Sequence, residues 1–141
     1  MSASRQVVER SLRAAIDEHL RPRGFRGSLP HLRRRGEDQV CLVSVQFRMG
    51  GGSLAVEVAE CPAEGFTTSW GEHVPADKVT ARDIASPRPR LGSPTFPSGD
   101  RWWHFDASAK RCDAIAAEVV RLVVRQAEPW WREQLELRSP G

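Results

Sequence analysis

The chain has 141 residues, of which 40% are hydrophobic and 28% charged, and its formal net charge is +3. This is the length of one domain with an ordinary globular composition, which excludes wholesale disorder, a collagen-like repeat and a coiled coil. The positive charge is concentrated at the start, because residues 1–48 hold ten arginines against five acidic side chains.

The first predicted element is an amphipathic helix from Ser4 to Leu20, since apolar residues recur there at helical spacing. This pattern puts His19 on the buried side of the helix. Residues 21–24 (Arg-Pro-Arg-Gly) close the segment, because proline cannot continue a helix and glycine tolerates the turn.

Three segments with strand character follow. Leu29 to Arg34 is short and basic, Val40 to Phe47 is rich in β-branched residues, and Leu54 to Val58 alternates between apolar and small or polar side chains. A glycine turn at residues 49–53 joins the last two segments. We therefore expect an antiparallel meander.

Residues 62–100 contain six of the ten prolines and predict an irregular segment that breaks into short pieces. The alternation of Phe66, Thr68 and Trp70 suits a short strand. Residues 75–83 suit one or two helical turns that begin at proline, and residues 88–91 suit an edge strand.

The last predicted strand spans residues 101–106. Successive side chains of a strand alternate, so Trp102 and Trp103 should face opposite sides of the sheet. Adjacent residues also diverge on a helix, and at least one of Trp130 and Trp131 should therefore approach the surface.

Ser108 is the predicted N-cap of a helix that runs to about Gln126. Pro129 should interrupt it before a short final helix over residues 130–137. These elements predict one α+β domain over residues 1–141. It would contain an antiparallel sheet of about five strands, with the N-terminal and C-terminal helices packed on one face and the other face free.

Cys41, Cys61 and Cys112 are too far apart in sequence to form a metal or redox motif. We expect reduced, space-filling thiols in the cytoplasm, with no metal and no cofactor. Charged residues interrupt the first twenty positions, and no apolar run approaches the roughly 18–20 residues of a membrane span, so neither a leader nor a membrane segment is expected.

Several weak motifs occur in a recognisable order: Leu20-Arg-Pro-Arg-Gly-Phe25, Val43-Ser-Val-Gln46, Arg90-Leu-Gly92, Asp100-Arg-Trp102-Trp103 and a helix that ends at Pro129. In this order, over about residues 8–135, the chain resembles a bacterial family of domains of unknown function catalogued as number 4304. The resemblance implies an α+β fold with an antiparallel sheet. It implies no established activity, cofactor or catalytic residues.

No catalytic motif is present, whereas tryptophan and arginine, the residue types enriched at the energetic centres of protein interfaces, are abundant. We therefore expect a non-catalytic protein-binding module, immunity-like or inhibitor-like, with another bacterial protein as partner. It would be a monomer or weak dimer. The contact surface would be the free sheet face together with residues 62–100. The candidate binding residues are Gln46, Arg90, Asp100, Trp102, Trp103 and His104.

Two alternatives remain open. A nucleic-acid accessory protein would use Arg33, Arg34 and Arg35, which otherwise form a solvated surface paired with local acids such as Glu37 and Asp38. A small enzyme or small-molecule carrier would hold its ligand in a pocket between the sheet and residues 62–100, near His104, Cys61 or Asp100.

Overall fold

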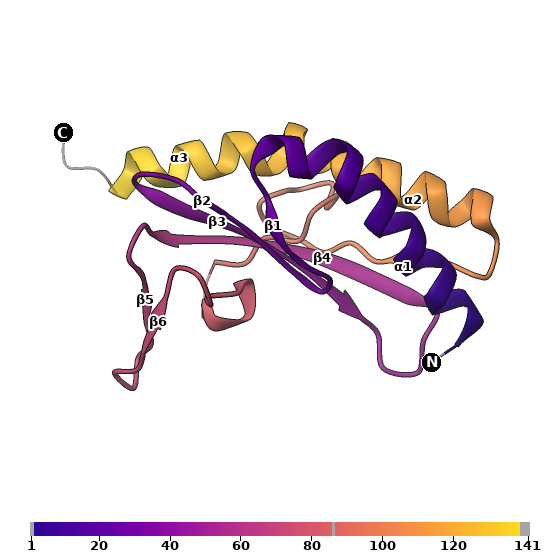
Figure 1. Ribbon diagram of the computed structural model, residues 1–141, viewed down its shortest axis with the longest axis horizontal. Helices are drawn as coiled ribbons and strands as arrows, with labels where there is room; N and C mark the ends of the chain where they lie inside the picture. The colour runs from indigo at the N-terminus through magenta and orange to yellow at the C-terminus, as the bar shows by residue number, and fades with distance from the viewer. Residues whose placement is uncertain (1, 86, 139–141) are drawn as a thin grey trace.

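The computed structural model describes residues 2–85 and 87–138 (Figure 1). Helices lie along one face of a five-stranded antiparallel sheet of order β1-β2-β3-β4-β7, which confirms the α+β class. A separate hairpin, β5-β6, lies on the opposite side. In chain order the elements are α1 (Ala3–Ala15), η1 (Ile16–Leu20), η2 (Arg21–Arg23), β1 (Arg26–Ser28), β2 (His31–Arg35), β3 (Gln39–Phe47), β4 (Ser53–Pro62), β5 (Gly65–Thr67), β6 (His73–Pro75), η3 (Ala81–Asp83), β7 (Trp103–His104), α2 (Ala109–Leu122), η4 (Val123–Ala127) and α3 (Glu128–Arg138).

The first helix matches its prediction. Ser2 caps α1 by accepting a hydrogen bond from the Arg5 backbone N–H, and the helical path continues through η1 to Leu20. His19 is not on the buried side, because its side chain is 54% exposed. The wider π-type turn of η1 shifts the face that each residue presents, so simple helical spacing misplaces this position.

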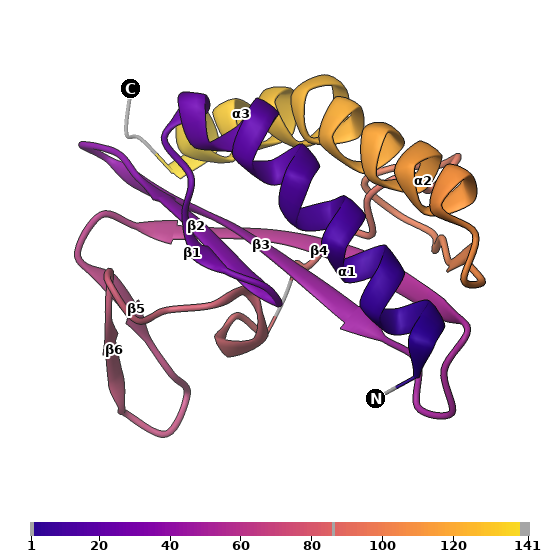
Figure 2. The same ribbon diagram turned by 45° about the vertical axis from the view of Figure 1, so that its right-hand side comes forward.

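The C-terminal helical region differs from its prediction at Pro129. Ser108 caps α2 as expected, with the Arg111 N–H 3.2 Å from the Ser108 hydroxyl. The helical path then runs through Pro129 without a break, because α2, η4 and α3 follow one another directly (Figure 2). Proline lacks an N–H, and its ring crowds the carbonyl four residues earlier. The wide turn of η4, immediately before it, accommodates both effects.

Strands β3 and β4 form the centre of the sheet, with Val43 opposite Val58. Their alternate side chains, together with the inward faces of the helices, form one continuous core. Trp130 and Trp131 are 6% and 1% exposed, so the prediction that one of them approaches the surface is wrong. Residues 92–97 lie against the C-terminal helix, with the Gly92 N–H 2.7 Å from Gln126 Oε1. Trp130 and Trp131 can therefore both be buried, because the helix has neighbours on more than one side.

The opposite face of the sheet is not free, contrary to the expectation. Four side chains from residues 76–84 pack on four from β3 and β4 to form a second apolar cluster, which comprises Val40, Leu42, Ala59, Cys61, Ala76, Val79, Ala81 and Ile84. Residues 76–84 form no strand, but the burial of their apolar side chains against the sheet is favourable without strand pairing. The segment therefore forms a thin third layer (Figure 2).

The pieces of residues 62–104 are shorter than predicted. The hairpin strand β5 ends at Thr67, and Trp70 lies in the turn beyond it with 76% of its surface exposed. A single helical turn, η3, falls within the predicted stretch. Arg90 makes an isolated bridge to Glu57 in place of an edge strand, and the last strand, β7, has only two residues.

Candidate binding surface

Four of the six predicted binding residues meet at the end of the sheet beside the β3–β4 loop. The Arg90 guanidinium donates to Gln46 Oε1 at 3.0 Å and to Asp100 Oδ1 at 3.3 Å. Asp100 also accepts a hydrogen bond from the Trp102 indole N–H at 3.1 Å. These side-chain contacts thus join the three segments that carry the four residues.

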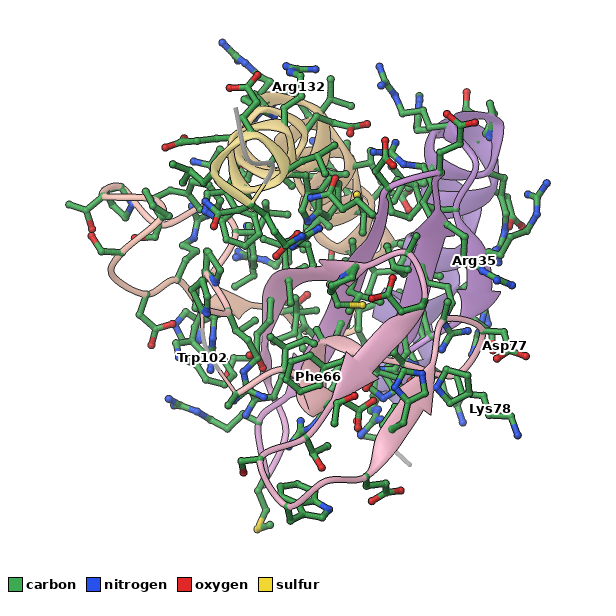
Figure 3. The ribbon with its side chains drawn as sticks, turned by 90° about the vertical axis from the view of Figure 1, so that its left-hand side faces the viewer. Arg35, Phe66, Asp77, Lys78, Trp102 and Arg132 are labelled. Carbon is green, nitrogen blue, oxygen red and sulfur yellow. The ribbon has the colours of Figure 1, made fainter. Side chains whose placement is uncertain are left out.

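Arg48 is a functional candidate that sequence reasoning missed. Its guanidinium lies over the Trp102 ring, 4.8 Å from the centroid, and the Arg90 guanidinium lies 5.2 Å from the same ring. The signal was present in the strand alternation, because Arg48 continues the even-numbered series that includes Gln46. We call Gln46, Arg48, Arg90, Asp100 and Trp102 the Trp102 patch; Figure 3 labels Trp102 itself.

The charges in the Trp102 patch are not balanced. Asp100 pairs with Arg90, but no carboxylate of residues 2–85 and 87–138 lies within 4.0 Å of the Arg48 guanidinium. The Asp100 side chain is 59% exposed, and Trp102 is half-buried. The patch therefore presents an aromatic surface and a free cation, both held in place by neighbouring contacts.

Trp103 and His104 do not join this patch. Trp103 is 4% exposed in the helix-side core, where its indole N–H donates to Glu118 Oε1. His104 lies exposed on β7. Trp103 and His104 both border a hollow of about 380 Å³ that separates Trp102 from α2. Its lining is Arg101, Trp102, Trp103, His104, Arg111, Ala114, Ile115 and Glu118.

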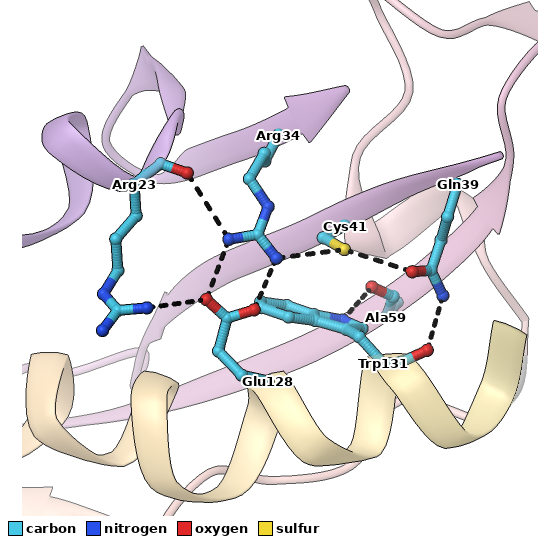
Figure 4. A network of polar contacts seen from close by, with 7 residues as sticks. All are labelled: Arg23, Arg34, Gln39, Cys41, Ala59, Glu128 and Trp131. Carbon is cyan, nitrogen blue, oxygen red and sulfur yellow. Dashed lines mark hydrogen bonds and ion pairs between the residues drawn. The ribbon is translucent and has the colours of Figure 1, made fainter. Parts of the chain in front are cut away.

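The three consecutive arginines of β2 are not one surface. Arg34 points toward the helices, where it forms a bidentate salt bridge with Glu128, with N–O distances of 2.8 and 2.5 Å (Figure 4). Arg23 adds a contact to the same carboxylate at 3.3 Å. The acid that Arg34 meets is therefore on α3, not the nearby Glu37 or Asp38.

Aromatic rings enclose the Arg34–Glu128 pair. The Arg34 guanidinium lies 4.8 Å from the Phe25 ring centroid and 5.5 Å from that of Trp131. The hydrogen bond with Glu128 raises the pKa of Arg34. Burial alone would raise the pKa of Glu128, but the hydrogen bond and charge of Arg34, with the charge of Arg23, outweigh it and hold that pKa below its usual value. Both groups are therefore ionised at neutral pH, and the pair serves the packing of α3 on the sheet.

Arg33 and Arg35 alternate with Arg34 and face the other side of the sheet. The Arg33 Nε–H donates to the Val79 carbonyl at 3.0 Å, and Arg35 is exposed. The predicted triple-arginine surface is therefore divided between two faces by the strand geometry.

The cysteines do not form a nucleophilic site. All three are buried, and burial raises the pKa of Cys41 to about 11 and that of Cys61 to about 12. Such thiols carry almost no thiolate at neutral pH. The residues that the structure describes contain no cluster of three or more side chains suited to hold a metal ion. Nor do they include a helix long and apolar enough to cross a membrane.

The protein is thus an α+β domain whose antiparallel sheet carries helices on one face and an irregular layer on the other. The family model described as "Domain of unknown function (DUF4304)" matches residues 16–133, and the chain belongs to this family. The resemblance noted from the sequence motifs is thereby confirmed. No curated protein matches the chain, and no solved structure matches it either.

Proposed function

We propose that this protein is a non-catalytic binding module that uses the Trp102 patch to hold an acidic segment of a partner protein. The single observation that supports it most is the arrangement of Trp102 under two guanidiniums, of which Arg48 has no carboxylate partner among the described residues. Tryptophan and arginine dominate the energetic centres of protein interfaces.

The Trp102 patch is also preorganised for binding. Asp100 holds both the Trp102 indole and the Arg90 guanidinium, and its Oδ1 accepts a further bond from the Arg101 N–H at 2.9 Å. A side chain that is already ordered loses less conformational entropy when a partner binds. The hollow on the far side of Trp102 gives room for one anchoring side chain of the partner.

The surface differs from the one expected from sequence. The sheet itself is covered, so the partner would contact the Trp102 patch and not the strands beneath it. The chemistry of the partner follows from the charge: a free arginine next to an aromatic ring favours a carboxylate beside an apolar side chain.

A displayed library of random 12-residue peptides tests the proposal. The wild-type protein should enrich peptides with clustered Asp or Glu around an apolar residue. The double variant Trp102→Ala, Arg48→Ala should bind the enriched peptides at least ten times more weakly.

The matched control removes the same residue types elsewhere, as Trp70→Ala with Arg132→Ala, and should bind like the wild type. Both residues of the control are exposed. Enrichment of no acidic peptides, or equal weakening in both double variants, would refute the proposal.

A further inference from the structure

A second cationic surface lies at the other edge of the sheet, on β1, β2 and η3. Arg26 stands directly opposite Arg33 in the β1–β2 pair, and Ser28 stands opposite His31. Side chains of directly opposed residues lie on the same side of a sheet, and like charges in such a pair repel each other. We call Arg26, His31, Arg33, Arg35 and Arg82 the Arg33 face.

The arginines of this face lack acidic partners within the part of the chain that the structure describes. Among residues 2–85 and 87–138, no carboxylate lies within 4.0 Å of the guanidinium of Arg26, Arg33, Arg35 or Arg82. On the opposite side of the sheet, by contrast, Arg23 and Arg34 share Glu128. The folded chain therefore pairs Arg23 and Arg34 with a carboxylate, whereas it places none of the described carboxylates against the four arginines of the Arg33 face.

The nearest acidic side chain on η3 is already engaged. Asp83 accepts hydrogen bonds from the Thr80 N–H at 2.8 Å and from the Thr80 hydroxyl at 3.4 Å, which cap this helical turn. Asp77 lies beside Lys78 on the exposed turn after β6, and Figure 3 shows both side chains below Arg35. Basic groups thus outnumber acidic ones on this surface.

Two members of the Arg33 face are held in fixed orientations. The Arg33 Nε–H bonds the Val79 carbonyl, so its two terminal NH2 groups remain free to bind a ligand. His31 Nδ1 lies 2.7 Å from the Ser44 hydroxyl, which fixes the imidazole ring. Burial lowers the pKa of His31, and the charges of Arg82 and Arg33 lower it further.

We propose that the Arg33 face binds the phosphate backbone of a nucleic-acid strand. A guanidinium with free terminal NH2 groups matches the geometry of a phosphate, and Arg33 and Arg35 are about 7 Å apart along the strand, a separation suited to successive phosphates of an extended chain. No exposed aromatic side chain belongs to this face, so the contact is to the backbone and is independent of base sequence.

The experiment measures fluorescence anisotropy of a labelled 20-nucleotide single strand from 50 to 200 mM salt. For four arginine–phosphate contacts, the logarithm of the affinity should fall against the logarithm of the salt concentration with a slope of about −3. The variant Arg33→Gln, Arg35→Gln should reduce this slope by about 1.4 and weaken binding on the order of 20-fold at 100 mM salt.

A second variant, Arg26→Gln with Arg82→Gln, changes two exposed residues and should show the same loss, which keeps the test valid if the first variant folds poorly. The control Arg125→Gln, Arg132→Gln removes the same charge from the C-terminal helical region and should change affinity less than twofold. Absence of wild-type binding at 50 mM salt, or an equal loss in the control, would overturn the proposal. Displacement of the strand by polyglutamate at equal charge concentration would overturn it in favour of an acidic protein.

Discussion

The two sides of the sheet are held by different kinds of contact. On the helix side, large side chains such as Leu54, Trp103 and Trp131 form a continuous core that includes one enclosed ion pair. On the other side, small apolar residues cover one end of the sheet, and polar contacts such as Arg88–Glu57 cover the rest. The first side provides most of the buried apolar surface, whereas the second presents polar groups with unused hydrogen-bonding capacity.

The division between the sides is visible within a single strand. Arg33 and Arg34 are adjacent on β2, yet Arg34 is paired and enclosed by rings while Arg33 keeps its terminal NH2 groups free. Arginine content alone therefore does not define a binding surface. What matters is whether the fold provides a carboxylate on the side that each guanidinium faces.

The largest loss of stability is expected for one of two tryptophan variants, one from each side of the sheet. Trp131→Ala should lower the free energy of unfolding by about 4 kcal/mol, because the indole is 1% exposed and its N–H bonds the Ala59 carbonyl at 2.8 Å. Trp102→Ala should cost about 1 kcal/mol, since a half-buried indole with cationic neighbours loses less. Urea unfolding followed by circular dichroism measures both, and equal losses would contradict the contrast between the two sides.

A smaller difference in stability is expected between variants of two carboxylates. Glu128→Gln should cost about 2 kcal/mol, because it leaves Arg34 partly buried without its counter-charge. Asp100→Asn should cost less than about 1 kcal/mol, because the Asp100 side chain is 59% exposed and water screens its ion pair with Arg90. The same urea titrations at pH 7 measure both values, and a larger cost for the Asp100 variant would contradict the prediction.

The pH dependence of the Glu128 variant adds a second measurement. The folded chain lowers the pKa of Glu128 below its usual 4.5, so the stabilisation is complete above pH 4.5 and is lost as the pH falls through the folded value. The wild type should therefore lose more stability than Glu128→Gln between pH 5 and pH 3.

The smallest effect is expected on the pKa of His31, which belongs to the Arg33 face. Burial, with the charges of Arg82 and Arg33, lowers the pKa of His31 below 6.5, while Asp83 opposes the shift. Stability from this residue is therefore complete above pH 6.5 and declines as the pH falls toward the folded value. Arg82→Gln should raise the pKa of His31 in an NMR titration, whereas Arg132→Gln should not. An unchanged value in the Arg82 variant would place η3 too far from β2 to share a ligand.

Local patterns predicted much of this fold. The helix from residue 4 to residue 20, the two central strands and the Ser108 cap all depend on periodicity, β-propensity and capping chemistry, which act over a few residues. The sequence indicated Gln46, Arg90, Asp100 and Trp102 as separate candidates, but it could not predict that they meet. No local rule gives the distance between segments forty residues apart.

Local sequence patterns were thus sufficient to predict the class of fold and the order of its main elements, since each of these follows from contacts along the chain. Long-range packing places residues 76–84 over the sheet, buries both Trp130 and Trp131, and pairs Arg34 with Glu128 instead of a ligand. These outcomes depend on which distant side chains meet, and the free energy of packing and ion pairing, not of local conformation, selects them.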